Sequence, residues 1–358
     1  MKRNILALAV LAAAASAVSA ETGVVLYGRV NTSIESQKIT GSDSVTVLQN
    51  NASRWGLRGA EDLGGGLKAF FTLESGFGSD TGQLTNNPST TGSSVGLFNR
   101  EAFAGIIGGL GTLRGGRMTS AVYFASADYI SMHNHDTGTS SDALFAFAAT
   151  GVNNNNTIAY KTPDFLGANV EVAYSLAAGF FPINPAAWQE QPSSNNQTNL
   201  QVAVNWDGGP LHLGGGYAVM KDQSGESLTP AVAENKDDMF VIRALYEIGP
   251  FTLGAYYERA KLQVAGDRRS RNNFRLAGMF MLGASEFHLN YGFADEFDGI
   301  SDSGADQFTF AYNYNLSKRT KVYAFYTQID QDANTNYYLG SANGDKFSSI
   351  AAGLRHHF

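Results

Sequence analysis

Near the start of the chain, arginines occupy one parity of short segments whose other parity is apolar. Arg54 and Arg58 share one parity of their segment, Trp55 and Leu57 take the other, and Arg29 lies in a similar segment upstream. An arginine keeps its proton at physiological pH, and its planar guanidinium can stack on other groups. The chemistry that this spacing predicts is electrostatic: fixed positive charge along one face of an extended chain.

Residues that make or break bonds form no comparable set. The chain has no cysteine. His133, His135 and Asp136 could be drawn as a metal site, but their spacing suits a loop and implies no further ligand. His212 and His288 have no nucleophile at a matching position. We therefore assign no catalytic residue, no metal and no cofactor.

A period of two in hydrophobicity runs through most of the chain and predicts strands with two unlike faces. In segment 199–206, large apolar residues alternate with Asn, Gln and Ala. We expect sixteen strands, near residues 24–37, 46–60, 66–79, 94–108, 111–118, 154–163, 167–178, 197–207, 210–221, 237–248, 251–264, 271–282, 285–297, 305–315, 319–331 and 345–358.

The connections between these strands alternate in length. Tight turns such as 108–111 and 207–210 carry turn residues, whereas connections such as 79–94 and 179–196 are long and polar. Outer-membrane barrels show this sorting, because one rim faces the periplasm and the other the outside. The predicted fold is all-β: a transmembrane antiparallel β-barrel of 16 strands, with short periplasmic turns, long external loops and a water-filled lumen. A soluble β-sandwich would share the alternation, but it has no reason to sort its loops.

The first twenty residues read as an export signal. Two basic residues precede the apolar run 5–18, and Val18-Ser19-Ala20 suits cleavage before Glu21. The run is too short for a membrane-spanning helix, which needs roughly 20 apolar residues. We expect a signal peptide at 1–20 and a single barrel domain at 21–358. Loss of Lys2 and Arg3 moves the formal net charge from −7 to −9, which argues against a nucleic-acid partner.

Three stretches of the chain resemble the general porins of β-proteobacteria and neisserial bacteria: SRWGLRGAEDLGGGLKAFFTLESGF (53–77), LFNREAFAGIIGGLGTLRGGR (97–117) and the closing GLRHHF. The resemblance implies homotrimers in the Gram-negative outer membrane, in contact with lipid and lipopolysaccharide. Each barrel would pass ions and small hydrophilic solutes by passive diffusion. Alternation points Phe358 outward at the membrane boundary, and the resemblance makes it the signal read by the barrel-assembly machinery.

The resemblance also makes segment 119–153 the third loop, folded into the lumen to form a constriction. Its acidic residues are Asp128, Asp136 and Asp142, and no Lys or Arg lies between residues 117 and 161. An acidic loop implies a basic wall opposite, with a field across the pore.

Candidates for this wall come from the first strands. Alternation turns Arg29, Arg54 and Arg58 inward and puts Glu74 and Lys68 together on the lumen side, and family motifs add Arg100 and Arg117. Arg117 shares the parity of the apolar Leu113, so a bulge or an intersubunit position is open for it. We interpret Arg243, Glu247, Glu258 and Arg275 as ordinary lumen lining away from the throat.

Ion selectivity follows from the charges nearest the throat. The net charge of the chain favours cations, whereas arginines at the narrowest point favour anions. Distant charges are screened within roughly 8 Å at physiological salt, so we expect a weak preference for anions. One alternative is a solute-selective porin for a particular anion or organic acid, with the arginines as a binding ladder. Less favoured alternatives are an outer-membrane barrel enzyme, such as a lipase or protease, and an adhesin.

Overall fold

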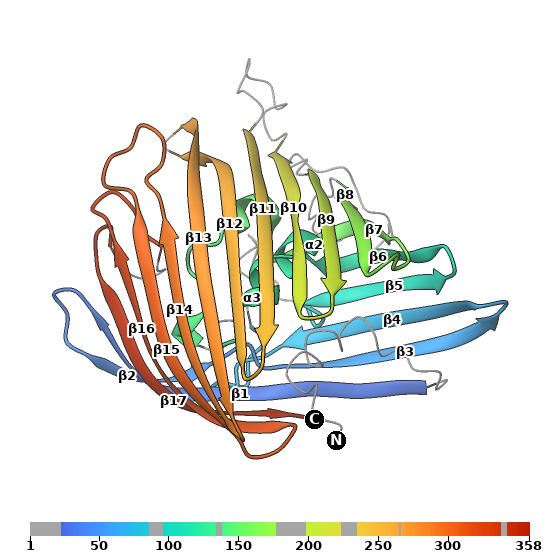
Figure 1. The fold of residues 1–358 in the computed structure, drawn as a ribbon, viewed down its shortest axis with the longest axis horizontal. Coiled ribbons are helices and arrows are strands. Elements are labelled where there is room, and N and C mark those ends of the chain that lie inside the picture. The colour runs from blue at the N-terminus through green and yellow to red at the C-terminus, as the bar shows by residue number, and fades with distance from the viewer. Residues whose placement is uncertain are drawn as a thin grey trace, which may run out of the picture.

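The computed structural model describes residues 23–85, 96–133, 138–176, 198–222, 235–264, 266–337 and 342–358. The described residues form seventeen strand segments in one antiparallel sheet, which closes because β1 pairs with β17 (Figure 1). The strands are β1 (Gly23–Ile39), β2 (Val45–Asn50), β3 (Arg54–Gly64), β4 (Leu67–Gly76), β5 (Glu101–Gly108), β6 (Gly111–Thr119), β7 (Asn153–Lys161), β8 (Ala168–Ser175), β9 (Thr198–Gly208), β10 (Leu211–Asp222), β11 (Asn235–Ile248), β12 (Phe251–Val264), β13 (Asp267–Leu282), β14 (Ser285–Ala294), β15 (Ala305–Asn315), β16 (Thr320–Gln331) and β17 (Phe347–His357).

The second barrel strand is interrupted, and this explains the count of seventeen. Both β2 and β3 pair with β1, and Ala52 between them has a left-handed backbone with φ of 54°. The two segments therefore make one strand of a closed 16-stranded barrel, and the predicted fold is confirmed.

The two faces of the wall differ as the alternation predicts. Leu253, Leu289 and Phe310 lie on one row across neighbouring strands, and each is about half exposed. The opposite parity carries buried polar residues such as Thr309 and Asn313. An outward apolar row suits lipid, whereas the inward polar row suits water.

The last residue extends the pairing of β1 with β17 at the closing seam of the barrel. Phe358 exchanges two backbone hydrogen bonds with Gly28, at 3.1 and 3.0 Å. Its ring lies over the Cα of Gly28 on the outer face, where a Cβ would meet ring carbon Cζ at 2.6 Å, and the residue is 43% exposed. The glycine therefore makes room for an aromatic ring at the membrane boundary.

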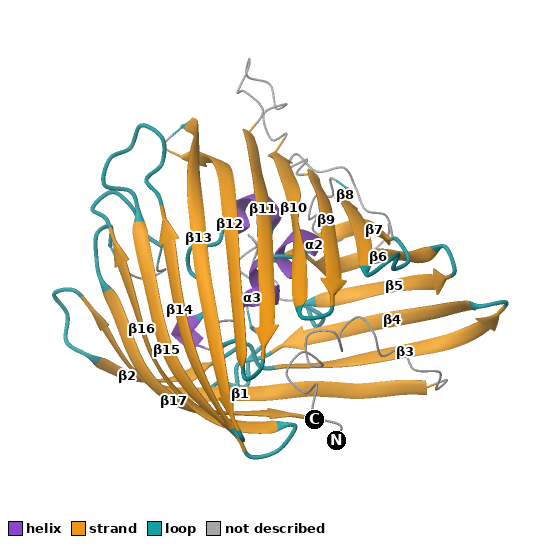
Figure 2. Ribbon diagram, viewed as in Figure 1, coloured by secondary structure: helices purple, strands orange, loops and turns teal. Residues whose placement is uncertain are grey.

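Segment 119–153 lies inside the barrel, as expected. Its described part contains α2 (Ala121–Phe124), α3 (Ala127–Ile130), the 3₁₀ turn η1 (Gly138–Ser140) and α4 (Phe147–Thr150). Figure 2 shows α2, α3 and α4 behind the ribbon of β9–β12, whereas η1 lies against β16. Among the described residues, no helix is long and apolar enough to span a membrane. The predicted signal peptide lies outside the described residues.

Candidate pore constriction

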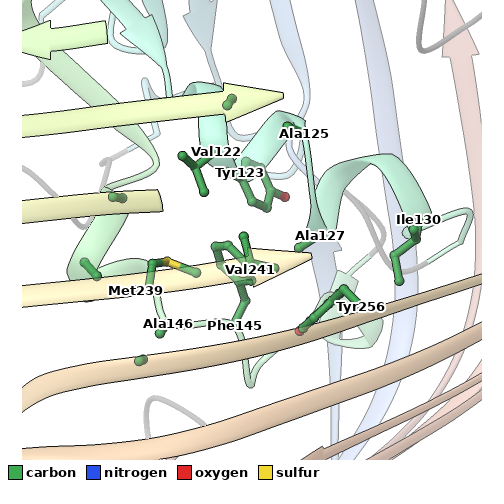
Figure 3. Close-up of a cluster of buried hydrophobic side chains, with 14 of the residues drawn as sticks. Val122, Tyr123, Ala125, Ala127, Ile130, Phe145, Ala146, Met239, Val241 and Tyr256 are labelled. Carbon is green, nitrogen blue, oxygen red and sulfur yellow. The ribbon is translucent and has the colours of Figure 1, made fainter. Parts of the chain in front are cut away.

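The loop inside the barrel, segment 119–153, docks on the wall through an apolar face. Val122, Ile130 and Phe145 from the loop are buried against Met239 and Tyr256, inward residues of β11 and β12 (Figure 3). Each large side chain buried in this way contributes roughly 1.5–3 kcal/mol. The loop is thus packed against the wall over β9–β13, where the inward parity carries apolar residues such as Met239 and Tyr256 among its polar ones.

Buried polar groups add fixed contacts beneath the loop. Arg243 Nε donates to the Ala125 carbonyl at 2.9 Å, and an Nη of Arg271 donates to the Leu144 carbonyl at 2.9 Å. The Ala146 N–H donates to a Glu258 carboxylate oxygen at 3.2 Å. Arg243 and Glu258 are buried. Our interpretation of them as ordinary lumen lining was wrong, because they hold the loop that narrows the lumen.

Asp142 is neutralised by the same wall. One carboxylate oxygen accepts from Arg275 at 2.8 Å, and the other accepts from the Tyr256 hydroxyl at 2.7 Å. Gln307 accepts from Arg275 at 2.6 Å and donates to the Ser141 carbonyl at 2.8 Å. Arg275 is 1% exposed and therefore also lies beneath the loop rather than on open lining. The charge of Asp142 is directed into the wall instead of across the pore.

The other two acidic residues of the loop do not supply a charged face in the described structure. Asp128 is 4% exposed, so its carboxylate is removed from the water of the lumen. Asp136 lies outside the described residues. The expected acidic surface opposite the arginines is absent from the part of the loop that the structure describes, because packing takes Asp128 and Asp142 out of solvent.

Glu74 organises the opposite wall. It lies 3.7 Å from Arg54 and 2.6 Å from Arg100, and the Tyr27 hydroxyl donates to it at 3.1 Å. Arg58 lies on the same face of β3 with its guanidinium carbon 5.0 Å from the centre of the Tyr27 ring. The structure therefore brings Arg54, Arg58, Arg100 and Glu74 together on one stretch of the inner wall.

Two further predicted wall residues are set apart from this group. Arg29 faces inward but is buried, and it donates to the carbonyls of Ala52 and Asn51 at 3.2 and 3.3 Å, which supports the interrupted strand. Lys68 shares the inner face of β4 with Glu74, but it lies six residues away along the strand. In the register of β3 against β4, it stands opposite Asp62. Glu74 is instead compensated by Arg54 and Arg100.

Arg117 lies on the outer face of the barrel. It stands opposite Ala102, on the outward row that includes Leu73, and it donates to the Asn99 carbonyl at 3.0 and 2.8 Å and to the side chain of Asn155. The register of β6 against β7 shifts beside it, so a bulge is present as well. Its placement on the lumen wall is thus corrected, because the parity of Leu113 continues through Arg117.

Comparison with known proteins agrees with this architecture. The family model described as Gram-negative porin matches residues 7–334 of the chain. The chain belongs to this porin family.

It is similar to Outer membrane porin protein 32 of Delftia acidovorans, with 29% identity over the full length of both chains. It is also similar to Major outer membrane protein P.IB of Neisseria meningitidis, with 24% identity over the full length of both chains. Among solved structures, it is similar to the anion-selective porin from Comamonas acidovorans, with 27% identity, a TM-score of 0.73, and coverage of 94% of this chain and all of the other. The resemblance drawn from the sequence is thereby confirmed.

The porin has more inward cations than the sequence interpretation named. Arg114 forms an ion pair with Glu171, Lys321 lies 3.1 Å from Glu286, and Arg355 stands opposite Lys321 on β17. Strict alternation would have found Arg114, since Leu113 beside it faces outward. Together with the arginines described in the preceding paragraphs, these residues form what we call the basic arc. It runs across the closing seam, from β16 through β17 and β1 to β6, and consists of Lys321, Arg355, Arg29, Arg54, Arg58, Arg100 and Arg114.

The loop itself carries a buried titratable group, His133, which is 3% exposed. Its ring centre lies 5.2 Å from that of His288 and 5.7 Å from that of Phe325. Burial lowers the pKa of His133 well below its usual value, and the nearby His288 lowers it further. The porin thus holds a neutral imidazole where the loop meets the wall. His135, the other histidine drawn into a metal site, lies outside the described residues.

Proposed function

We propose that this outer-membrane porin is a general diffusion channel whose constriction prefers anions. The observation that carries the proposal is the asymmetry of charge inside the barrel. The basic arc places seven cations on one side, more than the acids that pair with them (Glu74, Glu171 and Glu286), whereas Asp128 of the loop is buried and Asp142 is compensated by Arg275. An ion in the remaining water therefore meets net positive charge. The relatives are porins, whose function involves no covalent step.

The size of the effect can be worked out from Coulomb's law. One uncompensated charge roughly 5 Å from a passing ion in water, screened with a Debye length of about 8 Å, changes the energy of that ion by about 0.4 kcal/mol. An anion is stabilised and a cation is destabilised by this amount. The ratio of anion to cation permeability therefore rises about fourfold for each such charge. The acids of the outer loops act from beyond the Debye length and weigh less.

Arg54 and Arg58 offer a direct test. Reversal potentials in a gradient of KCl across a planar bilayer are expected to show anion preference for the unmodified porin. Replacing both residues with Gln should shift the reversal potential toward cations by several-fold in permeability ratio. Arg117→Gln is a matched control, because it removes the same charge from the outer face. Cation preference of the unmodified porin, or an unchanged reversal potential in the double variant, would refute the proposal.

We expect this porin to mature and assemble as the porins that it resembles do. The porin forms homotrimers in contact with lipid and lipopolysaccharide, after removal of residues 1–20, and Phe358 is the residue that the barrel-assembly machinery reads. The support is the family resemblance and the place of Phe358 at the outer seam, beside Gly28. Chemical cross-linking of purified outer membranes should give a trimer band, and amino-terminal sequencing should begin at Glu21. A monomer at all cross-linker concentrations would contradict the first expectation.

A further inference from the structure

Two phenylalanines stand on the water-facing side of the barrel wall, where the fold calls for polar residues. Phe70 on β4 and Phe103 on β5 lie edge to face, with ring centres 6.2 Å apart and an interplanar angle of 80°. Phe103 stands opposite Thr72, which stands opposite Arg58, so all three share the inner face. Both rings are half-buried, so part of each faces the lumen.

The two rings are held in place from the wall side. Phe103 packs against Met118, Ala159 and Ala173, which are buried inward residues of β6, β7 and β8. Phe70 lies over Gly105, where a Cβ would come within 2.9 Å of the ring. The glycine lets the ring lie along the wall instead of pointing into the channel. The result is a fixed apolar patch beside open water.

Two cations border this patch: Arg114, whose guanidinium carbon lies 5.4 Å from the centre of the Phe103 ring, and Arg58, whose donors are open. Arg54 and Arg100 are compensated by Glu74, and Arg114 by Glu171. Arg58 is half-buried and stacks on Tyr27, and within the described part of the chain no carboxylate or carbonyl accepts its N–H groups. It lies two strand spacings from Phe103, which is roughly 10 Å between the backbones. Thr72 lies between them.

We propose that Arg58, Thr72, Phe70 and Phe103 form a binding subsite in the channel for monocyclic aromatic carboxylates. A carboxylate accepts two parallel hydrogen bonds from the guanidinium of Arg58. The attached ring then extends over Thr72 and meets the phenylalanine rings in an edge or offset arrangement. The inference rests on the proposed function, because the ligand must first enter an anion-preferring pore. It adds a solute class that a charge preference alone does not select.

The chemistry of the site distinguishes this class from its neighbours. An aliphatic carboxylate such as acetate can bind Arg58 but makes no ring contact, and a neutral aromatic such as benzyl alcohol can contact the rings but leaves Arg58 without an anion. Benzoate satisfies both groups. A subsite in a channel must also release its solute, so binding is weak and is read as a brief interruption of ion current.

The test is single-channel recording in chloride with benzoate, acetate or benzyl alcohol added. Benzoate should interrupt the current in a concentration-dependent way, at concentrations at least tenfold below those at which acetate or benzyl alcohol has an effect. Arg58→Gln should abolish this difference, and Phe103→Leu, which keeps an apolar side chain, should reduce it several-fold. Arg54→Gln is the matched control: it removes one charge from the same face of the same strand but should leave the ratio of benzoate to acetate unchanged.

The outcomes separate this inference from the proposed function. If the unmodified porin prefers anions but benzoate and acetate act alike, the subsite is refuted and the diffusion channel stands. If benzoate still interrupts the current of Arg58→Gln, the site has been placed wrongly. If the unmodified porin prefers cations, the proposed function fails first. Benzoate and acetate are compared within each variant, and the insertion of conducting channels into the bilayer shows that each variant has folded.

Discussion

The contact between Asp142 and Arg275 should decide whether the loop stays on the wall. Asp142→Ala removes the carboxylate that accepts from Arg275 and Tyr256 at 2.8 and 2.7 Å. Arg275 is 1% exposed and keeps Gln307 as an acceptor, so its charge would remain buried without a counter-ion. Removing one partner of a buried ion pair costs about 3–5 kcal/mol. The equilibrium between the docked and detached loop should therefore shift by roughly 10² to 10⁴ toward the detached state.

Single-channel recording measures this shift. The unmodified porin should carry a steady current, because the apolar face of the loop and the Asp142 contact act together. Asp142→Ala should show frequent transitions between current levels as the loop leaves the wall. Replacing both partners, as Asp142→Ala with Arg275→Met, should restore a steadier current, because no uncompensated charge remains buried. A current from Asp142→Ala as steady as that of the unmodified porin would refute the view that this contact restrains the loop.

Two further predictions follow from buried groups. His133 has a lowered pKa because it is buried, and the nearby Arg355 and Lys321 lower it further. The detached loop takes up a proton at His133 more readily, so the contribution of His133 to docking should be complete above about pH 6.5 and fall by up to about 1.4 kcal/mol per pH unit below it. Current noise should therefore rise between pH 7 and pH 5, and His133→Phe should remove this dependence; equal noise at both pH values in the unmodified porin would count against it. At the seam, Gly28→Ala should lower the temperature at which the folded barrel unfolds in detergent, because the new methyl group meets the Arg54 carbonyl oxygen at 2.5 Å and the C-terminal ring at 2.6 Å. Gly23→Ala, with no heavy atom within 4 Å of the added carbon, is the control, and equal losses in both variants would contradict the account.

The barrel could be predicted from the sequence because its cause is local. Most strands separate lipid from water, so each of them carries the alternation in its own few residues, and its ends are marked by its own turns. The strands around Leu253 and Leu289 needed no knowledge of their neighbours to be placed. The inward direction of Arg54 and Arg58 followed from the same rule, and so did the outward direction of Phe358.

The placement of the loop was decided by the tertiary structure. Arg275 and Asp142 are 133 positions apart in the chain, and nothing near either one indicates the other. The same holds for Glu258, which receives the N–H of Ala146 across 112 positions. The sequence held one indication of where the loop docks. Around Met239, both parities of the strand are apolar, and this is expected for a wall whose inner side is covered by protein. Which acids the loop buries, and hence which arginines act on ions without opposition, depends on packing between distant segments, and alternation along a single strand carries no information about it.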